Sequence, residues 1–201
     1  QKLADLYGSG AFPLNYPNEW DKRQGRGGSG IWLHGTPSDT FARPPRASDG
    51  CVVLTNQDLD VVAKNLQVGL TVIISNSVEW LSLDDWAKER SELNKSIDAW
   101  RADWESRDTD RYLKHYSQRF KAGDQDFAEF SAQKKQVNAG KEWIKLKIDN
   151  LSVFRNPGKD EVVVVTFDQD YRSNNLNNQM KKRQYWLREG SQWKIIYEGS
   201  A

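Results

Sequence analysis

The stretch HGTPSDTFARPPRASDGC, from His34 to Cys51, is the part of the chain from which its fold and function are inferred. It contains the only cysteine and one of the two histidines among 201 residues. A cysteine becomes a useful nucleophile when an imidazole or backbone N–H groups stabilise its thiolate. Gly50 lets the backbone approach a substrate carbonyl closely. The N–H groups of Gly50 and Cys51 are therefore candidates for an oxyanion hole, at a tight turn that includes Ser48 and Asp49.

A second interpretation of Cys51 is an inert core thiol. Free cysteine is among the most buried residue types, and Cys51 opens an apolar run that ends at Leu54. The ordered pair favours the functional interpretation, because a histidine precedes the cysteine at the far end of a loop rich in proline and arginine.

This pair resembles the signature of the L,D-transpeptidase catalytic domain, found in the cysteine enzymes that cross-link peptidoglycan. That signature is a histidine, a loop of somewhat over a dozen residues, and Ser/Thr-x-Gly-Cys. The preceding stretch Tyr7–Asp21 is similar to the segment that leads into the histidine strand, so the resemblance covers residues 1 to about 76. Familiar members have a second histidine where Asp49 stands and an asparagine where Val53 stands. The chain looks closer to a branch of murein L,D-transpeptidases that includes cell-shape enzymes acting as L,D-carboxypeptidases.

The resemblance implies a mechanism and assigns roles. Cys51 attacks the carbonyl of the L,D-peptide bond in a peptidoglycan stem tetrapeptide. His34 supports the thiolate and protonates the departing D-alanine, and the carbonyl of Gly35 orients the imidazole. An amine or water then resolves the thioester. Arg43 and Arg46 suit the carboxylates of the stem, or else they lie in solvent.

Composition restricts the remaining possibilities. The 29 basic and 28 acidic residues nearly cancel, which argues against a nucleic-acid-binding protein. One cysteine and two histidines allow neither an internal disulfide nor an ordinary structural zinc site, and we expect no metal or cofactor. No apolar run is long enough to span a membrane, and no signal peptide opens the chain.

The resemblance also implies a periplasmic or cell-envelope location, with an export signal that is not in this fragment. It places the opening strands of the catalytic domain before the stretch Tyr16–Asn18. We therefore expect this 201-residue chain alone to be inactive or nearly so.

The pattern changes to a long helix at Leu83, and we place the domain boundary between residues 87 and 88. The first domain, 1–87, is the C-terminal part of the catalytic domain with a linker, and the second is 88–201. Apolar residues spaced four, three and four apart predict one buried helix face, formed by Leu93, Ile97, Trp100 and Trp104. Further helices are predicted at Thr109–Phe120 and Phe127–Val137. Strands are predicted from Trp143, at Val162–Phe167, and in a hairpin that turns at Glu189–Ser191.

Three helices followed by a curved antiparallel sheet are similar to the nuclear-transport-factor-2-like (NTF2-like) fold, and the ending YWLREGSQWKIIYEG is the most specific part of the match. The expected fold class is therefore mixed: a partial β-rich L,D-transpeptidase-type domain, then an α+β cone of three helices on a curved antiparallel sheet. Members use the cone as an active site or as an interaction surface, and the fold does not decide which.

The sequence also predicts four local features. Residues 58–66 form a short helix capped by Asn56 or Asp58. Val68–Ser75 forms a buried strand. His115 is a packing or surface histidine without a carboxylate signature around it, and Lys181–Arg183 is a solvated turn.

Two alternatives to an enzyme acting on peptidoglycan stem peptides remain open. In the first, the chain is a wall- or partner-binding module whose catalytic part is vestigial. In the second, the cone itself holds a small-molecule active site. A homodimer or a protein partner, bound through the C-terminal domain, is the further partner that we consider.

Overall fold

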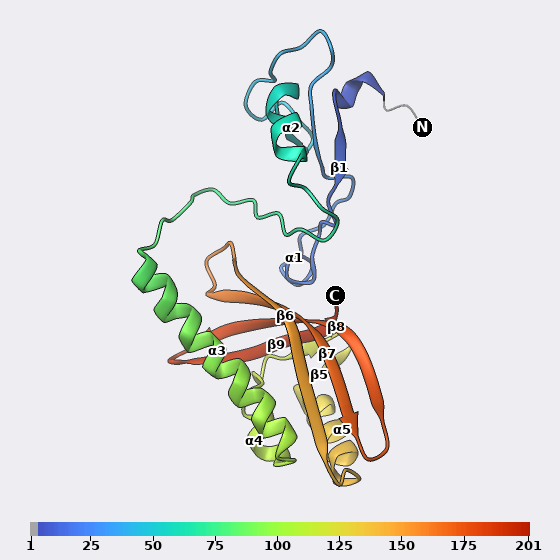
Figure 1. The fold of residues 1–201 in the computed structure, drawn as a ribbon, viewed down its shortest axis with the longest axis vertical. Coiled ribbons are helices and arrows are strands. Elements are labelled where there is room, and N and C mark those ends of the chain that lie inside the picture. The colour runs from blue at the N-terminus through green and yellow to red at the C-terminus, as the bar shows by residue number, and fades with distance from the viewer. Residues whose placement is uncertain (1–3) are drawn as a thin grey trace. The chain divides into compact units, whose positions relative to one another are not determined.

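The chain folds into two compact units that divide between Val72 and Ile73, and the computed structural model describes residues 4–201 (Figure 1). The expected mixed fold class is confirmed. The sequence-based boundary between residues 87 and 88 falls inside helix α3 (Leu83–Glu105). No helix among residues 4–201 has both the length and the apolar character that crossing a bilayer requires.

The first unit is built around a small three-stranded sheet. Its central strand β2 pairs antiparallel with β1 on one side and parallel with β3 on the other. Leu33 of β2 and Leu59 of the helix that follows β3 are both buried. In chain order the elements are the 3₁₀ helix Asp5–Tyr7, β1 (Ala11–Pro13), α1 (Glu19–Arg23), β2 (Trp32–His34), β3 (Val52–Val53) and α2 (Asn56–Ala63).

Helix α2 begins two residues earlier than the sequence predicted, and its cap is neither Asn56 nor Asp58. Thr55 is the N-cap, and its side chain accepts a hydrogen bond from the backbone N–H of Asp58 at 3.1 Å. The side chain of Asn56 is consequently available for other contacts.

The predicted strand Val68–Ser75 is wrong. This segment has no regular structure among the described residues, and its apolar side chains are exposed, including Val68, Leu70 and Ile74. A run of β-branched residues becomes a strand only when a neighbouring strand pairs with its backbone, and no sheet edge of the described chain does so here.

The second unit packs three helices against one face of a four-stranded antiparallel sheet (Figure 1). The strands follow one another in sequence order, so each neighbour is reached by a hairpin. The elements are α3, α4 (Thr109–Leu113), β4 (Lys121–Ala122), β5 (Gln125–Asp126), α5 (Phe127–Ala139), β6 (Ile144–Asn156), β7 (Val162–Ser173), β8 (Asn177–Glu189) and β9 (Gln192–Ser200).

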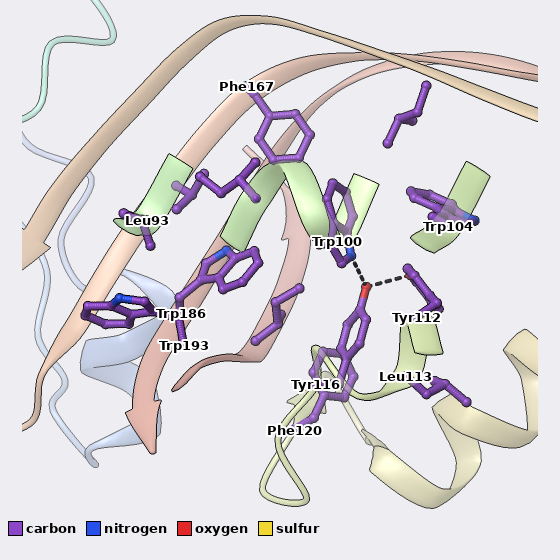
Figure 2. Close-up of a cluster of buried hydrophobic side chains, with 14 of the residues drawn as sticks. Leu93, Trp100, Trp104, Tyr112, Leu113, Tyr116, Phe120, Phe167, Trp186 and Trp193 are labelled. Atoms are coloured by element: carbon purple, nitrogen blue, oxygen red, sulfur yellow. Dashed lines mark hydrogen bonds between the residues drawn. The ribbon is translucent and has the colours of Figure 1, made fainter. Parts of the chain in front are cut away.

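The apolar stripe of α3 is confirmed. Leu93, Ile97, Trp100 and Trp104 are all buried, and Figure 2 shows three of them (Leu93, Trp100 and Trp104) among the aromatic residues of the sheet and of α4. Ser82 caps the helix by accepting from the N–H of Asp85 at 3.1 Å.

Helix α4 is shorter than the predicted Thr109–Phe120. After Leu113 the backbone leaves the helix and bonds to strand β9: Ile195 N donates to His115 O at 2.8 Å, and Ser117 N donates to Ile195 O at 2.9 Å. Helical periodicity continued in the sequence, but the open edge of β9 satisfied these backbone groups instead.

We expect the second unit to fold by itself, because it has its own helix face and its own sheet to cover. A chain that begins at Ser82 should unfold cooperatively on heating, followed by circular dichroism. A chain that begins at Lys88 lacks the Ser82 cap and the first turn of α3, and should be less stable by about 1 kcal/mol or more. Non-cooperative melting of the longer chain would contradict this expectation.

Candidate active site

His34 ends the central strand of the first unit, and its backbone is held from both sides. It pairs with Ala11 of β1 and with Val53 of β3, and its carbonyl accepts from Leu54 N at 3.0 Å. The residue is only 3% exposed. Its Nδ1 lies 2.7 Å from the carbonyl oxygen of Gly35. A carbonyl only accepts, so Nδ1 carries the proton in this contact and Nε2 of the neutral ring is left as the basic nitrogen.

Cys51 immediately precedes β3 and is half-buried. Paired residues of neighbouring strands project to the same face, and residues two apart along a strand share a face. Since Val53 is opposite His34, the register puts Cys51 on the same side of the sheet as the imidazole. Strand spacing and rise place the two Cα atoms about 8 Å apart. The Sγ atom makes one polar contact, 3.5 Å to the carbonyl of Gly30.

The turn before the cysteine depends on a glycine. Gly50 has φ +103°, and a Cβ built there would lie 2.7 Å from Cδ1 of Ile31. Ser48 closes the turn by donating from Oγ to the carbonyl of Cys51 at 2.6 Å, while Asp49 is exposed. A side chain at residue 50 would therefore strain the backbone and press against the side chain of Ile31, the residue before β2.

The sequence analysis missed Tyr7, which covers the histidine. Its ring meets the imidazole of His34 edge-on at a centroid distance of 5.4 Å and stacks on Trp32 at 4.9 Å. Trp32 and His34 are two apart on β2 and share a face, so one ring spans both. Sequence spacing gives no signal for this contact, because 27 residues separate Tyr7 from His34.

Asn56 is the second residue that the analysis missed, having taken it for a helix cap. Its Oδ1 accepts from the backbone N–H groups of Ser9 at 3.0 Å and Thr36 at 3.1 Å. Its Nδ2 donates to the carbonyl of Thr36 at 3.0 Å. One side chain thus joins three segments: the turn after the 3₁₀ helix, the residues after His34, and the start of α2.

Among residues 4–201, no hydrogen bond or ion pair brings the two loop arginines to this face. Arg43 is half-buried and Arg46 is exposed with φ +61°. Neither guanidinium makes an ion pair or a hydrogen bond within residues 4–201. Their role in binding substrate carboxylates stays a prediction.

The second unit contains a buried charged cluster that the sequence analysis also missed. Lys182, expected in a solvated turn, lies within β8, and its Nζ is 3.4 Å from Oε1 of Glu198, with both side chains less than a tenth exposed. Oε2 of Glu198 accepts from Tyr116 at 2.9 Å and from Gln184 at 3.2 Å. Figure 2 shows the hydroxyl of Tyr116 bonded in turn to Trp100 and Tyr112.

The protonation of this cluster follows from its surroundings. Burial opposes ionisation of Glu198, but Lys182, Lys134 and the two hydrogen bonds more than offset it, so the pKa of Glu198 lies below its ordinary value. Burial lowers the pKa of Lys134 and raises the pKa of Tyr116. The expected solvated turn at Lys181–Arg183 is therefore wrong: the run lies within β8, and the strand register turns its middle residue inward.

His115 has a carboxylate partner after all, which corrects the sequence-based expectation. Its Nε2 lies 2.8 Å from Oδ2 of Asp103, twelve residues earlier on α3. Burial lowers the pKa of His115 despite the hydrogen bond to Asp103, which acts in the opposite direction. Its backbone carbonyl also accepts from Ile195, so the residue ties α4 to β9.

The interior of the cone is filled by side chains. Trp100, Tyr112, Phe167 and Trp186 are at or near 0% exposed and lie at the centre of the core. An open groove of about 750 Å³ instead lies over β6 and the end of α3. Within residues 4–201 no three His, Cys, Asp or Glu side chains are grouped so as to hold a metal ion.

Each of the two units matches the model of a known protein family. The family model of the L,D-transpeptidase catalytic domain matches residues 3–74, and that of the Cds6 C-terminal NTF2-like domain matches residues 92–199. The chain belongs to the family in which an L,D-transpeptidase catalytic domain is joined to this NTF2-like domain. A comparison with curated protein sequences finds no match.

Solved structures of at least two proteins resemble nearly the whole chain. Bd1075 of Bdellovibrio bacteriovorus is 33% identical with a TM-score of 0.86, over 98% of this chain and 70% of its own. Pgp2, the helical cell shape determining protein of Campylobacter jejuni, is 29% identical with a TM-score of 0.80, over 97% of this chain and 69% of its own.

Proposed function

We propose that this protein carries out cysteine-dependent acyl transfer on peptidoglycan stem tetrapeptides, in remodelling of the cell wall. Membership of the L,D-transpeptidase family supports peptidoglycan as the substrate class. The observation that carries the proposal is the pairing of β2 with β3, which, continued by one residue, indicates that Cys51 shares the face of His34, whose Nδ1 is engaged by the Gly35 carbonyl. That arrangement leaves Nε2 as the nitrogen able to accept a proton.

The reaction runs in two steps. The Cys51 thiolate attacks the carbonyl of the L,D-peptide bond, a thioester forms, and the imidazolium of His34 gives its proton to the amine of the departing D-alanine. The N–H groups of Gly50 and Cys51 stabilise the oxyanion. An amine of a second stem then takes the acyl group, which is transpeptidation, or water does, which is carboxypeptidation.

The similarity to a cell shape determining protein supports a role in setting cell shape, in the periplasm or elsewhere in the cell envelope. For the NTF2-like unit we propose a binding role, toward the wall, a protein partner or a second copy of the chain. Its filled interior supports this over a small-molecule active site within the cone.

The test is mass spectrometry of muropeptides incubated with the intact protein. Tetrapeptides that lose one alanine residue identify a carboxypeptidase, and new cross-linked dimers identify a transpeptidase. Unchanged tetrapeptides, with binding of the protein to isolated cell walls, would overturn the enzymatic proposal in favour of a wall-binding module with a vestigial catalytic part.

A further inference from the structure

The orientation of the His34 ring depends on one peptide group. The carbonyl oxygen of Gly35, 2.7 Å from Nδ1, is fixed to the same planar unit as the N–H of Thr36. In a trans peptide these two groups point in opposite directions. Any group that holds the N–H of Thr36 therefore also aims the Gly35 carbonyl at the imidazole.

Asn56 holds that N–H. Its Oδ1 accepts from Thr36 N at 3.1 Å, and its Nδ2 donates to Thr36 O at 3.0 Å, so the amide grips both polar backbone groups of one residue. Thr36 is 1% exposed, so water does not compete freely for these bonds. A hydrogen bond to the N–H also polarises the carbonyl of the same peptide group and strengthens the bond that it accepts.

The backbone packs closely around the Asn56 amide. A Cβ placed on Gly35 or on Gly8 would lie 2.1 Å from Oδ1 of Asn56. Gly35 N is itself bonded to the carbonyl of Tyr7 at 3.0 Å. Two glycine backbones thus close over the Asn56 amide, and the segment after His34 is fixed from both sides.

We propose that Asn56 is a positioning residue that sets the tautomer and orientation of His34 through the Gly35–Thr36 peptide group. Without its acceptor, the peptide plane rotates and Nδ1 loses its partner. The proton then distributes between the two ring nitrogens, and Nε2 is no longer consistently free. The effect on catalysis rests on the proposed acyl transfer. The effect on the His34 tautomer is independent of that function.

The experiment is nitrogen-15 NMR of the imidazoles in the full 201-residue chain, recorded at alkaline pH. The chain has only two histidines, so His115 serves as an internal reference. Unsubstituted protein should show His34 with the proton on Nδ1 alone. Asn56→Ala should show mixed tautomers at His34 with His115 unchanged, and Gln57→Ala, an exposed neighbour on the same helix, should show no change.

A folded Asn56→Ala variant that keeps the single Nδ1–H tautomer would overturn the proposal. If that variant does not fold, Asn56→Asp decides, because its carboxylate still accepts from Thr36 N–H. A single Nδ1–H tautomer in Asn56→Asp supports the proposal, and mixed tautomers refute it. In the intact enzyme, Asn56→Ala should lower kcat about 100-fold at similar KM. An inactive wild type would count against the proposed function and leave the NMR result valid.

Discussion

Replacing Cys51 with alanine is expected to reduce D-alanine release by the intact protein on the order of 10⁴-fold or more, because the proposed acyl intermediate forms on this residue, the only cysteine in the sequence. The free energy of unfolding should change by only about 1 kcal/mol. The thiol is half-buried, and within the described part of the chain its polar contact is the long one to the carbonyl of Gly30. Product release measured by mass spectrometry, together with a thermal melt, gives both quantities.

Two variants serve as controls for this prediction. Cys51→Ser keeps the size of the side chain and should be nearly as inactive, since a hydroxyl is a far weaker nucleophile than a thiolate. Asp39→Ala changes an exposed residue of the same loop and should retain activity. Turnover that persists in Cys51→Ala would exclude the cysteine mechanism.

The second large effect concerns stability. Lys182→Met is expected to lower the free energy of unfolding of the NTF2-like unit by about 3 kcal/mol, because it leaves Glu198 buried without its nearest cation. Lys134 still acts on the carboxylate, which keeps the loss near the lower end of the range for broken buried pairs. The double variant Lys182→Met/Glu198→Gln removes both charges and should recover most of the loss in urea unfolding. A double variant as unstable as the single one would contradict this account.

The same carboxylate gives a pH dependence whose sign is fixed. The pKa of Glu198 in the folded protein lies below its ordinary value of 4.5, so its stabilising contribution is present above that value. It is lost as the pH falls through the lower folded pKa, because the unfolded chain then binds the proton more readily. Glu198→Gln should therefore show a shallower loss of stability on acidification than the unsubstituted protein. Parallel acid profiles for the two would refute the assignment.

Elements with a strong local period were predictable. Helix α3 has its stripe and its Ser82 cap within one stretch, and the β8–β9 hairpin turns at Gly190, where φ is +62°. These structures are specified by residues close together in the sequence. The pairing of His34 with Cys51 came from the family signature, and its catalytic role stays a prediction.

Sequence alone therefore determined the mixed fold class, the long helix, the terminal hairpin and the family. Tertiary structure decided what depends on distant partners. Residues 68–75 stayed irregular because no described strand pairs with them, and α4 ended early because β9 took its backbone bonds. Lys182 was turned inward by its register opposite Phe167, and Asn56 reached Ser9 across 47 residues. For α4, Lys182 and Asn56, a hydrogen-bonding or charge partner elsewhere in the chain outweighed a local preference of at most about 1 kcal/mol per residue, whereas residues 68–75 found no partner to support theirs.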